Sequence, residues 1–467
     1  MITLVFRQSQ FLKGVPKKII GVEIFVDVDL SSDDVKRIVK KENVKFIQLQ
    51  FTDVFGRLKN IAITPRKLDE ALNNEIMFDG SSIRGFTSVD ESDMYLAPDP
   101  TTFKIFPWRT NKRGSTARMI CDVYNPDGTP FEGCPRYVLK KVLEELEEYG
   151  YEFCVGPEVE FFLFQTNDNG DPTTKTHDEA GYFDLAPNDL GEDAREDMCL
   201  TLEELGFNIE ASHHECAPGQ HEIDFKYDGA LATADNVSTF KLVVKTIAKS
   251  HGLHATFMPK PIKEAHGTCM HLNQSLMKDG KNIFCSDSDE LGLSQEAYYY
   301  IGGLIKYARQ FAAITNASVN SYKRFVKGYE APTHISWGAA DRSPLIRIPA
   351  AKRMATRVEL RNPDPTANHY LALAAVLSAG LAGIKNKIEP PKCFDGCSYD
   401  VDYKKKEFSN IEEFPSSLGE ALEELENSTL MREALGDHIF NMYLTAKKNE
   451  WRQYNEEIHT WELKKYL

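Results

Sequence analysis

Residues 156–164 read GPEVEFFLF, and this stretch decides how the larger part of the chain folds. Glu158 and Glu160 lie two positions apart in a strongly apolar run, and in a β-strand such side chains point to the same face. Two carboxylates on one face repel each other and raise each other's pKa unless a cation lies between them. The stretch therefore predicts a strand that contributes to a metal site, although a solvated strand end is the commoner explanation of an isolated Glu-x-Glu pair.

The chain around this stretch alternates between strand-like and helical patterns. Strands are predicted at residues 151–155, 159–164, 222–227, 270–274 and 357–360, and helices at 297–315, 370–385 and 418–443. The fold class is therefore α+β, with a large domain over residues 134–467 that contains a broad antiparallel sheet.

A smaller N-terminal α+β domain is predicted over residues 31–128. Residues 44–53 alternate in polarity, turn at 53–56 and continue in an apolar run at 61–63, which indicates a hairpin. Ser31 and its polar neighbours offer N-caps for a helix through Lys41. The turn NPDGTP at 125–130 and a helix that starts at Pro135 mark the boundary, and residues 1–30 form an atypical extension.

Three further motifs gather the side chains that bind metals and anions. IEASHHECAPGQHEIDF at 209–225 places acids and imidazoles around a Pro–Gly turn, and HGTCMHLNQSL at 266–276 places His271, Asn273 and Ser275 on one strand face. RVELRNPDP at 357–365 alternates Arg357, Glu359 and Arg361, which is an arrangement that grips phosphate or carboxylate. A lone arginine is more often a surface ion pair, but four such motifs together imply metals and an anionic ligand.

Composition excludes several other classes of protein. The chain has 467 residues, 42% of them hydrophobic, which suggests two or three domains. A net charge of −15 makes nucleic acid a poor partner. No apolar run approaches the roughly 20 residues of a membrane span, and no signal peptide is evident. The nine cysteines are scattered and read as reduced thiols, so the cytoplasm is the expected location.

From about Val44 to its end, the sequence resembles the bacterial type I glutamine synthetases, in their non-adenylylated, feedback-inhibited branch. The resemblance rests on FDGSSIRGF, GPEVEFF, HHECAPGQHEID, KRFVKGYEAP, RSPLIRIP and RVELRNPDP, which occur in the family's order. It implies a β-grasp-like N-terminal domain, a catalytic domain, and a dodecamer of two hexameric rings with active sites between subunits. It also implies ATP-dependent condensation of glutamate with ammonia through γ-glutamyl phosphate.

The resemblance also implies a role for individual residues. One Mg²⁺ or Mn²⁺ ion would be bound by Glu160, Glu215 and Glu222, and a second by Glu158, His271 and Glu359. Glutamate would contact Gly267, Arg324, Arg342 and Arg361, and ATP would contact Glu210, Asn273, Ser275, Arg347 and Arg357. The ammonium pocket would consist of Asp79 from the adjacent subunit, Ser82, Tyr182, Glu215 and Glu330. Asp79, Glu330 and Arg342 would be catalytic, with Asp79 taking the proton of ammonium and Glu330 closing the site.

One departure from the family's pattern and two alternatives stay open at this point. HGTCMH differs from the family's Asn-Gly-Ser-Gly-Met-His pattern at His266 and Cys269, beside the implied glutamate site. A γ-glutamyl-polyamine ligase would keep the metal and ATP residues but need a roomier amine pocket. A non-enzymatic relative would be expected to lose a metal ligand, and binding of nitrogen-regulator proteins is a further possibility of this branch.

Overall fold

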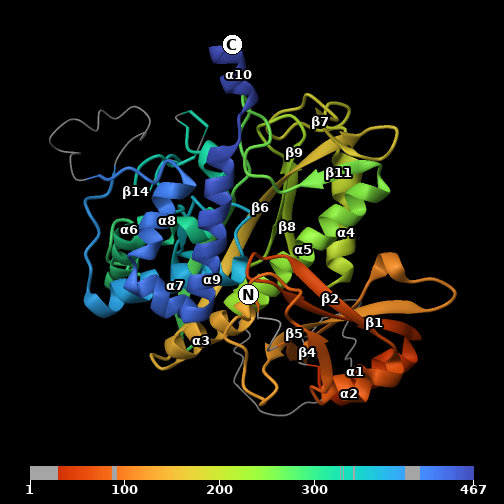
Figure 1. Cartoon of the computed structure of the whole chain (residues 1–467). Coiled ribbons are helices and arrows are strands. Elements are labelled where there is room, and N and C mark those ends of the chain that lie inside the picture. The colour runs from red at the N-terminus through yellow and green to blue at the C-terminus, as the bar shows by residue number, and fades with distance from the viewer. Residues whose placement is uncertain (1–29, 87–91, 327, 330, 340–341, 395–410) are drawn as a thin grey trace, which may run out of the picture.

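The computed structural model describes residues 30–86, 92–326, 328–329, 331–339, 342–394 and 411–467, which form two lobes in contact (Figure 1). The predicted extension at 1–30 lies almost wholly outside the described residues. Among the described residues, no helix is long and apolar enough to cross a membrane. Each of the eight cysteines in this part of the chain is a free thiol.

The N-terminal lobe is a five-stranded sheet with two helices. It comprises α1 (Ser32–Lys41), β1 (Val44–Thr52), β2 (Leu58–Ile63), α2 (Leu68–Leu72), β3 (Ile76–Asp79), β4 (Asp93–Ile105) and β5 (Ser115–Tyr124). The strand order is β2-β1-β5-β4-β3, with β1 and β5 parallel and the other pairs antiparallel. Ser31 caps α1 through a reciprocal pair of hydrogen bonds with Asp34, so the predicted capped helix and the β1–β2 hairpin are confirmed.

The large lobe contains an eleven-stranded sheet whose central strand is β6 (Glu152–Thr166). Its main path is β14-β15-β16-β12-β6-β9-β8, comprising Trp337–Gly338, Ile346–Arg347, Val358–Leu360, Met270–Lys278, β6 itself, Gln220–Phe225 and Ile209–His214. Off this path lie β7 (Pro172–Thr176), β10 (Asp228–Gly229), β11 (Leu253–Thr256) and β13 (Lys281–Asn282). The pairing is antiparallel as predicted, except that β14 and β15 are parallel.

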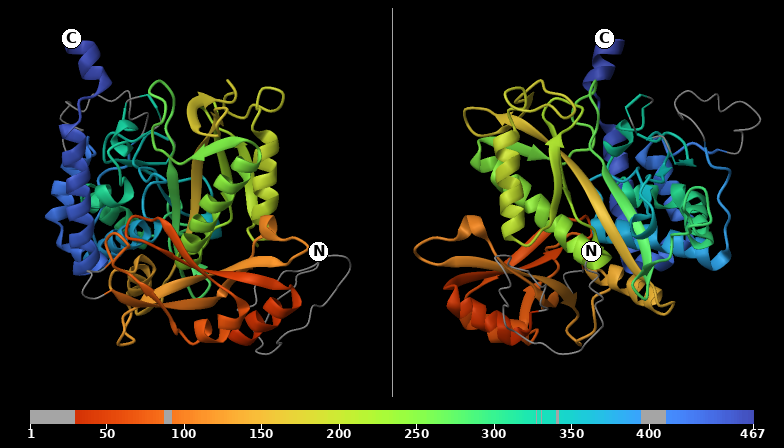
Figure 2. Two further views of the ribbon diagram at one scale, coloured as in Figure 1. Left: turned by 45° about the vertical axis from the view of Figure 1, so that its right-hand side comes forward. Right: turned by 180° about the vertical axis from the view of Figure 1, so that it is seen from behind.

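Helices lie on both sides of this sheet. In Figure 1, α4 (Glu192–Glu204) and α5 (Ala230–Ser250) lie on one side, and α6 (Gln295–Thr315), α7 (His369–Asn386), α8 (Leu418–Glu426) and α9 (Thr429–Glu456) lie on the other. The helix α3 (Pro135–Glu147) follows the N-terminal lobe, as the Pro135 start predicts. The final helix, α10 (Thr460–Tyr466), has no buried residue and projects from the end of the molecule opposite the N-terminal lobe (Figure 2).

Three features of the large lobe differ from the sequence-based expectation. The two strands predicted at 151–155 and 159–164 are one continuous strand that runs through Pro157. On one side Pro157 lies opposite Leu272 of β12. On the other side it falls in the gap between the residues that pair with β10 and those that pair with β9. A missing backbone N–H costs little at such a gap. Helices α4 and α5 were not predicted, and the predicted tail helix at 418–443 is two helices that extend to Glu456.

Specific polar contacts join the two lobes. Asn368, which caps α7, donates from Nδ2 to the carbonyls of Asp53 and Val54, each over 3.1 Å. Arg136 of α3 is buried and pairs with Asp99 and Asp122 of the N-terminal sheet and with Asp235 of α5. The active-site sheet is therefore fixed relative to the N-terminal lobe within one chain.

Candidate active site

The register of three strands gathers acids and an imidazole at the centre of the large sheet. Glu158 on β6 lies opposite His271 on β12, and Glu160 lies opposite Glu222 on β9. His271 Nδ1 is 3.2 Å from a carboxylate oxygen of Glu158 and 3.8 Å from one of Glu359. One ligand atom each of Glu158, His271 and Glu359 lies within 4.8 Å of the other two, so the three residues of one implied metal set lie together.

The other implied set is divided between two neighbouring groups. Glu215 and Glu222 lie within 4.8 Å of each other and of His213, whereas Glu160 falls into a group with Cys269 and His271. Glu160 accepts hydrogen bonds at Oε2 from the backbone N–H of Cys269 (2.9 Å) and from Gln220 Nε2 (2.7 Å). These two donors orient Glu160 toward the start of β12.

The surroundings of these carboxyl groups raise the pKa of two of them and lower that of a third. Burial, together with the neighbouring Cys269 and Glu215, raises the pKa of Glu160 well above its usual range. Burial and the carboxyls of Asp224 and Glu160 do the same to Glu222. Burial alone would raise the pKa of Glu158, but the hydrogen bond and charge of His271 outweigh it and lower that pKa to about 2. Glu160 and Glu222 therefore carry an unfavourable crowding of acidic groups, whereas Glu158 is compensated by its direct hydrogen bond with His271.

The residues implied in glutamate binding lie beside this centre. Arg324 is 1% exposed, donates from Nη1 to the carbonyl of Asn362 (2.9 Å), and has Nη2 2.6 Å from the thiol sulfur of Cys269. Arg361 donates to Glu359. A Cβ at Gly267 would lie 2.8 Å from Arg324 Cγ and 2.4 Å from the carbonyl oxygen of Pro259, so only glycine fits there.

Arg342 and Tyr182 meet near the acids of the β8–β9 turn. The pKa of the Tyr182 phenol is raised by burial and by Glu215, and the charge and hydrogen bond of Arg342 act against that rise. Three residues implied in the glutamate and ammonium sites therefore lie near one another in a single chain.

A cavity of about 290 Å³ opens next to Glu158. It is lined by four of the five residues implied in ATP binding, namely Glu210, Asn273, Ser275 and Arg357. Arg357 donates from Nε to Asn273 (2.8 Å), and Asn273 donates to Glu158 (2.8 Å), so the cavity is linked directly to the acids. The fifth residue, Arg347, does not line the cavity but lies 2.6 Å from Glu359.

Three predicted site residues stand apart from this centre. Asp79 ends β3 in the N-terminal lobe, is exposed, and accepts hydrogen bonds from the hydroxyl and the backbone N–H of Ser81, which lower its pKa. Ser82 lines a groove of about 910 Å³ between the lobes, together with Lys241 and Lys447. Neither residue belongs to the carboxylate groups of the described part of the same chain. Glu330 lies outside the described residues.

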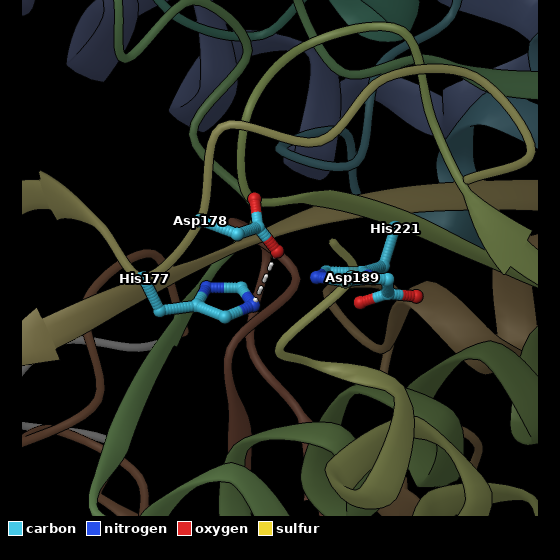
Figure 3. Close-up of side chains that lie close together, drawn as sticks. All are labelled: His177, Asp178, Asp189 and His221. Atoms are coloured by element: carbon cyan, nitrogen blue, oxygen red, sulfur yellow. Dashed lines mark ion pairs between the residues drawn. The ribbon is translucent and has the colours of Figure 1, made fainter. Parts of the chain in front are cut away.

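A second polar cluster, His177, Asp178, Asp189 and His221, joins β9 to the segment between β7 and α4 (Figure 3). His177 Nε2 is 2.9 Å from Asp178, and Arg195 Nη1 is 2.6 Å from Asp189 and 3.0 Å from His221 Nδ1. Because a guanidinium only donates, Nδ1 of His221 accepts, and the neutral ring carries its proton on Nε2. His221 therefore offers an N–H rather than a lone pair to the cluster. We interpret the cluster as a structural network that holds the loop carrying Tyr182.

Sequence reasoning named no role for Gln220, His213 and Asp224. Gln220, Glu222 and Asp224 alternate along β9, and Asp224 lies opposite Glu158, where burial raises its pKa to about 6. The period-two pattern could have placed Gln220 and Asp224 on the face of Glu222, but a neutral amide carries no metal-binding signal by itself.

Comparisons with known proteins agree over nearly the whole chain. The family model described as glutamine synthetase, beta-Grasp domain, matches residues 43–126, and the model described as glutamine synthetase, catalytic domain, matches residues 132–466. The chain is 55% identical over 437 residues to a glutamine synthetase of Clostridium saccharobutylicum, which covers 94% of this chain and 98% of that protein. It is 51% identical over 438 residues to a glutamine synthetase of Staphylococcus aureus (strain MW2), with the same coverage of 94% and 98%.

Solved structures of similar proteins share the fold. A cryo-EM structure of Plasmodium falciparum glutamine synthetase has a TM-score of 0.85 and 26% identity over 94% of this chain and 99% of that chain. A GmaS/ADP complex has a TM-score of 0.83 and 32% identity over 93% of this chain and 99% of that chain.

Proposed function

The chain belongs to the glutamine synthetase family, and on this premise we propose how its residues carry out the ATP-dependent condensation of L-glutamate with ammonia. A glutamate–ammonia ligase forms γ-glutamyl phosphate and then L-glutamine, ADP and phosphate. The observation that carries the assignment of roles is the strand register that brings Glu158, His271 and Glu359 together beside the cavity next to Glu158.

The donor set fits two hard divalent cations. The family uses metal and ATP, and we propose Mg²⁺ or Mn²⁺ as the ions, since carboxylate oxygens with one imidazole suit both. One ion would bind Glu158, His271 and Glu359, and the other Glu160, Glu215 and Glu222. The raised pKa values of Glu160 and Glu222 support this, because crowded acids are what a bound cation relieves. Bound cations supply charge neutralisation for the transferred phosphoryl group.

The arginines and the cavity position the two anionic substrates. A carboxylate is a poor electrophile, so the γ-carboxylate of glutamate must receive the phosphoryl group before ammonia can attack it. ATP would occupy the cavity lined by Glu210, Asn273, Ser275 and Arg357. Arg324 and Arg361 would orient glutamate, while Arg342 and Arg347 would lie against the phosphoryl group in transfer, where positive charge lowers the barrier.

The amine site would be completed by a second copy of the chain. Asp79 is exposed in the N-terminal lobe and its pKa is lowered, so it is ionised at neutral pH and attracts ammonium. We propose that Asp79 and Ser82 of one subunit meet Tyr182 and Glu215 of the next, and that Asp79 accepts the proton that ammonium must lose before it attacks.

We propose a homo-oligomer, a dodecamer of two hexameric rings in the cytoplasm. Large apolar side chains are exposed on the C-terminal segment, at Ile458 (69%), Trp461 (62%) and Tyr466 (75%), and a second subunit would cover them. The proposal predicts that deleting residues 458–467 lowers the molar mass measured by light scattering. An unchanged mass would show that this segment does not hold the assembly together.

The activity is tested by following phosphate release and glutamine formation with Mg²⁺, ATP and glutamate. Ammonium should support both in equal amounts, whereas putrescine and ethanolamine should not. Turnover with one of those amines would instead favour a γ-glutamyl-polyamine ligase. If no phosphate and no amide formed with any of the three amines, the non-enzymatic alternative would be favoured.

The metal roles are tested with a matched pair of variants on β6. Glu158→Gln should lower glutamine formation at least about 100-fold, because it removes a charged ligand. Glu152→Gln, at the exposed start of the same strand, should leave activity within about twofold. Equal activities of the two variants would refute the assignment of Glu158.

A further inference from the structure

Cys269 adds a sulfur donor to the centre that binds the catalytic metals. It directly precedes β12, is buried, and forms with Glu160 and His271 a group whose ligand atoms all lie within 4.8 Å of one another. We propose that these three residues form a site for a thiophilic divalent cation, such as Zn²⁺ or Cd²⁺, which excludes the catalytic Mg²⁺ when it binds.

The donor set of this group is soft, unlike those of the two implied sites. A thiolate selects Zn²⁺ and Cd²⁺, whereas carboxylates with at most one imidazole, as in the two implied sites, suit Mg²⁺ or Mn²⁺. Three protein ligands and one open position are a usual arrangement for zinc. The thiol proton of Cys269 leaves to solvent as the bond from sulfur to metal forms.

The ring of His271 is oriented so that one nitrogen faces the carboxylates and the other is left for an ion. His271 Nδ1 faces the carboxylates of Glu158 and Glu359, which only accept, so this nitrogen carries a proton. The other nitrogen, Nε2, is buried and has no hydrogen-bond partner in the described structure. A ring that donates from one nitrogen to a carboxylate and offers the other to a metal is typical of metal-binding histidines. His221 differs, because Arg195 faces its Nδ1.

Glu160 is oriented in a similar way. Gln220 and the backbone N–H of Cys269 both donate to Oε2, which leaves Oε1 to face an ion. Arg324 Nη2, 2.6 Å from the sulfur, must move aside or share it when the ion binds. Since Arg324 is implied in glutamate binding, we expect the ion to weaken glutamate binding as well as Mg²⁺ binding, and both effects rest on the proposed function.

The binding test uses the full-length, metal-free protein and Cd²⁺ as the probe. Titration should produce the ultraviolet charge-transfer absorption of a bond between thiolate and Cd²⁺. Cys269→Ser should lose this absorption and bind Cd²⁺ at least about 100-fold more weakly. Cys285→Ser removes a half-buried thiol outside the group and should titrate like the unmodified protein. Absorption that persists in Cys269→Ser would overturn the proposal.

Competition gives a second measurement that needs no variant. Glu160 and His271 are shared with the implied Mg²⁺ or Mn²⁺ sites, so increasing Mn²⁺ should remove the absorption of the Cd²⁺-loaded protein. If saturating Mn²⁺ leaves the absorption unchanged, the sulfur site does not share these ligands and the proposal is wrong. The Cd²⁺ titration needs neither activity nor a bound Mn²⁺, so an inactive protein would refute the proposed function without affecting that result.

Discussion

Gln220 Nε2 donates a hydrogen bond of 2.7 Å to Glu160 and a second of 3.1 Å to the carbonyl of Gly267. One amide on β9 thereby ties an implied metal ligand on β6 to the loop of the implied glutamate site. An outer contact of this kind orients a carboxylate ligand, and its loss typically costs 10–100-fold in metal affinity, so about that factor is expected here.

We therefore predict that Gln220→Leu raises the Mn²⁺ concentration needed for half-maximal activity by about 10–100-fold. The Michaelis constant for glutamate should also rise, because the Gly267 loop loses a donor. Gln165→Leu is the matched control: Gln165 lies on β6, and its amide donates to the carbonyl of Thr176, away from the acids. If both variants need the same Mn²⁺ concentration, Gln220 does not orient a ligand.

The raised pKa values of Glu160 and Glu222 predict a pH-dependent effect of metal on stability. Burial and neighbouring acidic groups keep both carboxyls protonated in the metal-free native state. The neighbours are Cys269 and Glu215 for Glu160, and Asp224 and Glu160 for Glu222. The unfolded chain instead releases these protons near an ordinary pKa of about 4.3. The native state then binds more protons than the unfolded state, so its stability falls as pH rises from that value through the folded-state pKa.

A divalent cation replaces these protons, so metal should stabilise the protein more as pH rises. Thermal unfolding with and without Mn²⁺ across this pH range checks the sign, and an indicator dye detects the released protons. Glu222→Gln should release fewer protons than the unmodified protein. Metal binding without proton release at neutral pH would contradict the assignment of these carboxyls as protonated.

Local patterns predicted the strands of the site, but not the contacts that cross between them. Alternation along GPEVEFFLF and RVELRNPDP places Glu158, Glu160 and Glu359 on the correct faces, because a period of two depends only on neighbours. The partners of Glu160 come from Gln220 and Cys269, far along the chain, and no local pattern joins them. Helix α5 was missed because buried residues lie along most of its length, which leaves no amphipathic period.

Arg136 should be among the most sensitive positions for stability. It is buried and contacts Asp99 (2.7 Å), Asp122 (3.1 Å) and Asp235 (3.0 Å), which come from both lobes. Arg136→Met would leave Asp99 and Asp235 without the cation that pairs with them, and we expect a loss of about 3–5 kcal/mol in the free energy of unfolding. Arg37→Met removes an exposed pair with Asp34 and should leave the unfolding midpoint nearly unchanged. Urea unfolding compares the two, and equal midpoints would contradict the structural role of Arg136.

Gly267 should be essential because of space rather than backbone conformation. A Cβ there would lie 2.4 Å from the carbonyl oxygen of Pro259 and 2.8 Å from Arg324 Cγ, and neither backbone nor a buried arginine yields easily. We expect Gly267→Ala to displace Arg324 and to raise the Michaelis constant for glutamate at least about tenfold, which corresponds to 1.4 kcal/mol. The constant for ATP should change little, because the cavity next to Glu158 is lined by other residues. Gly229→Ala is the control, since a Cβ there meets nothing within 4 Å, and steady-state kinetics should find it unchanged. If Gly267→Ala instead raised both constants equally, Arg324 would not be the group that the glycine protects.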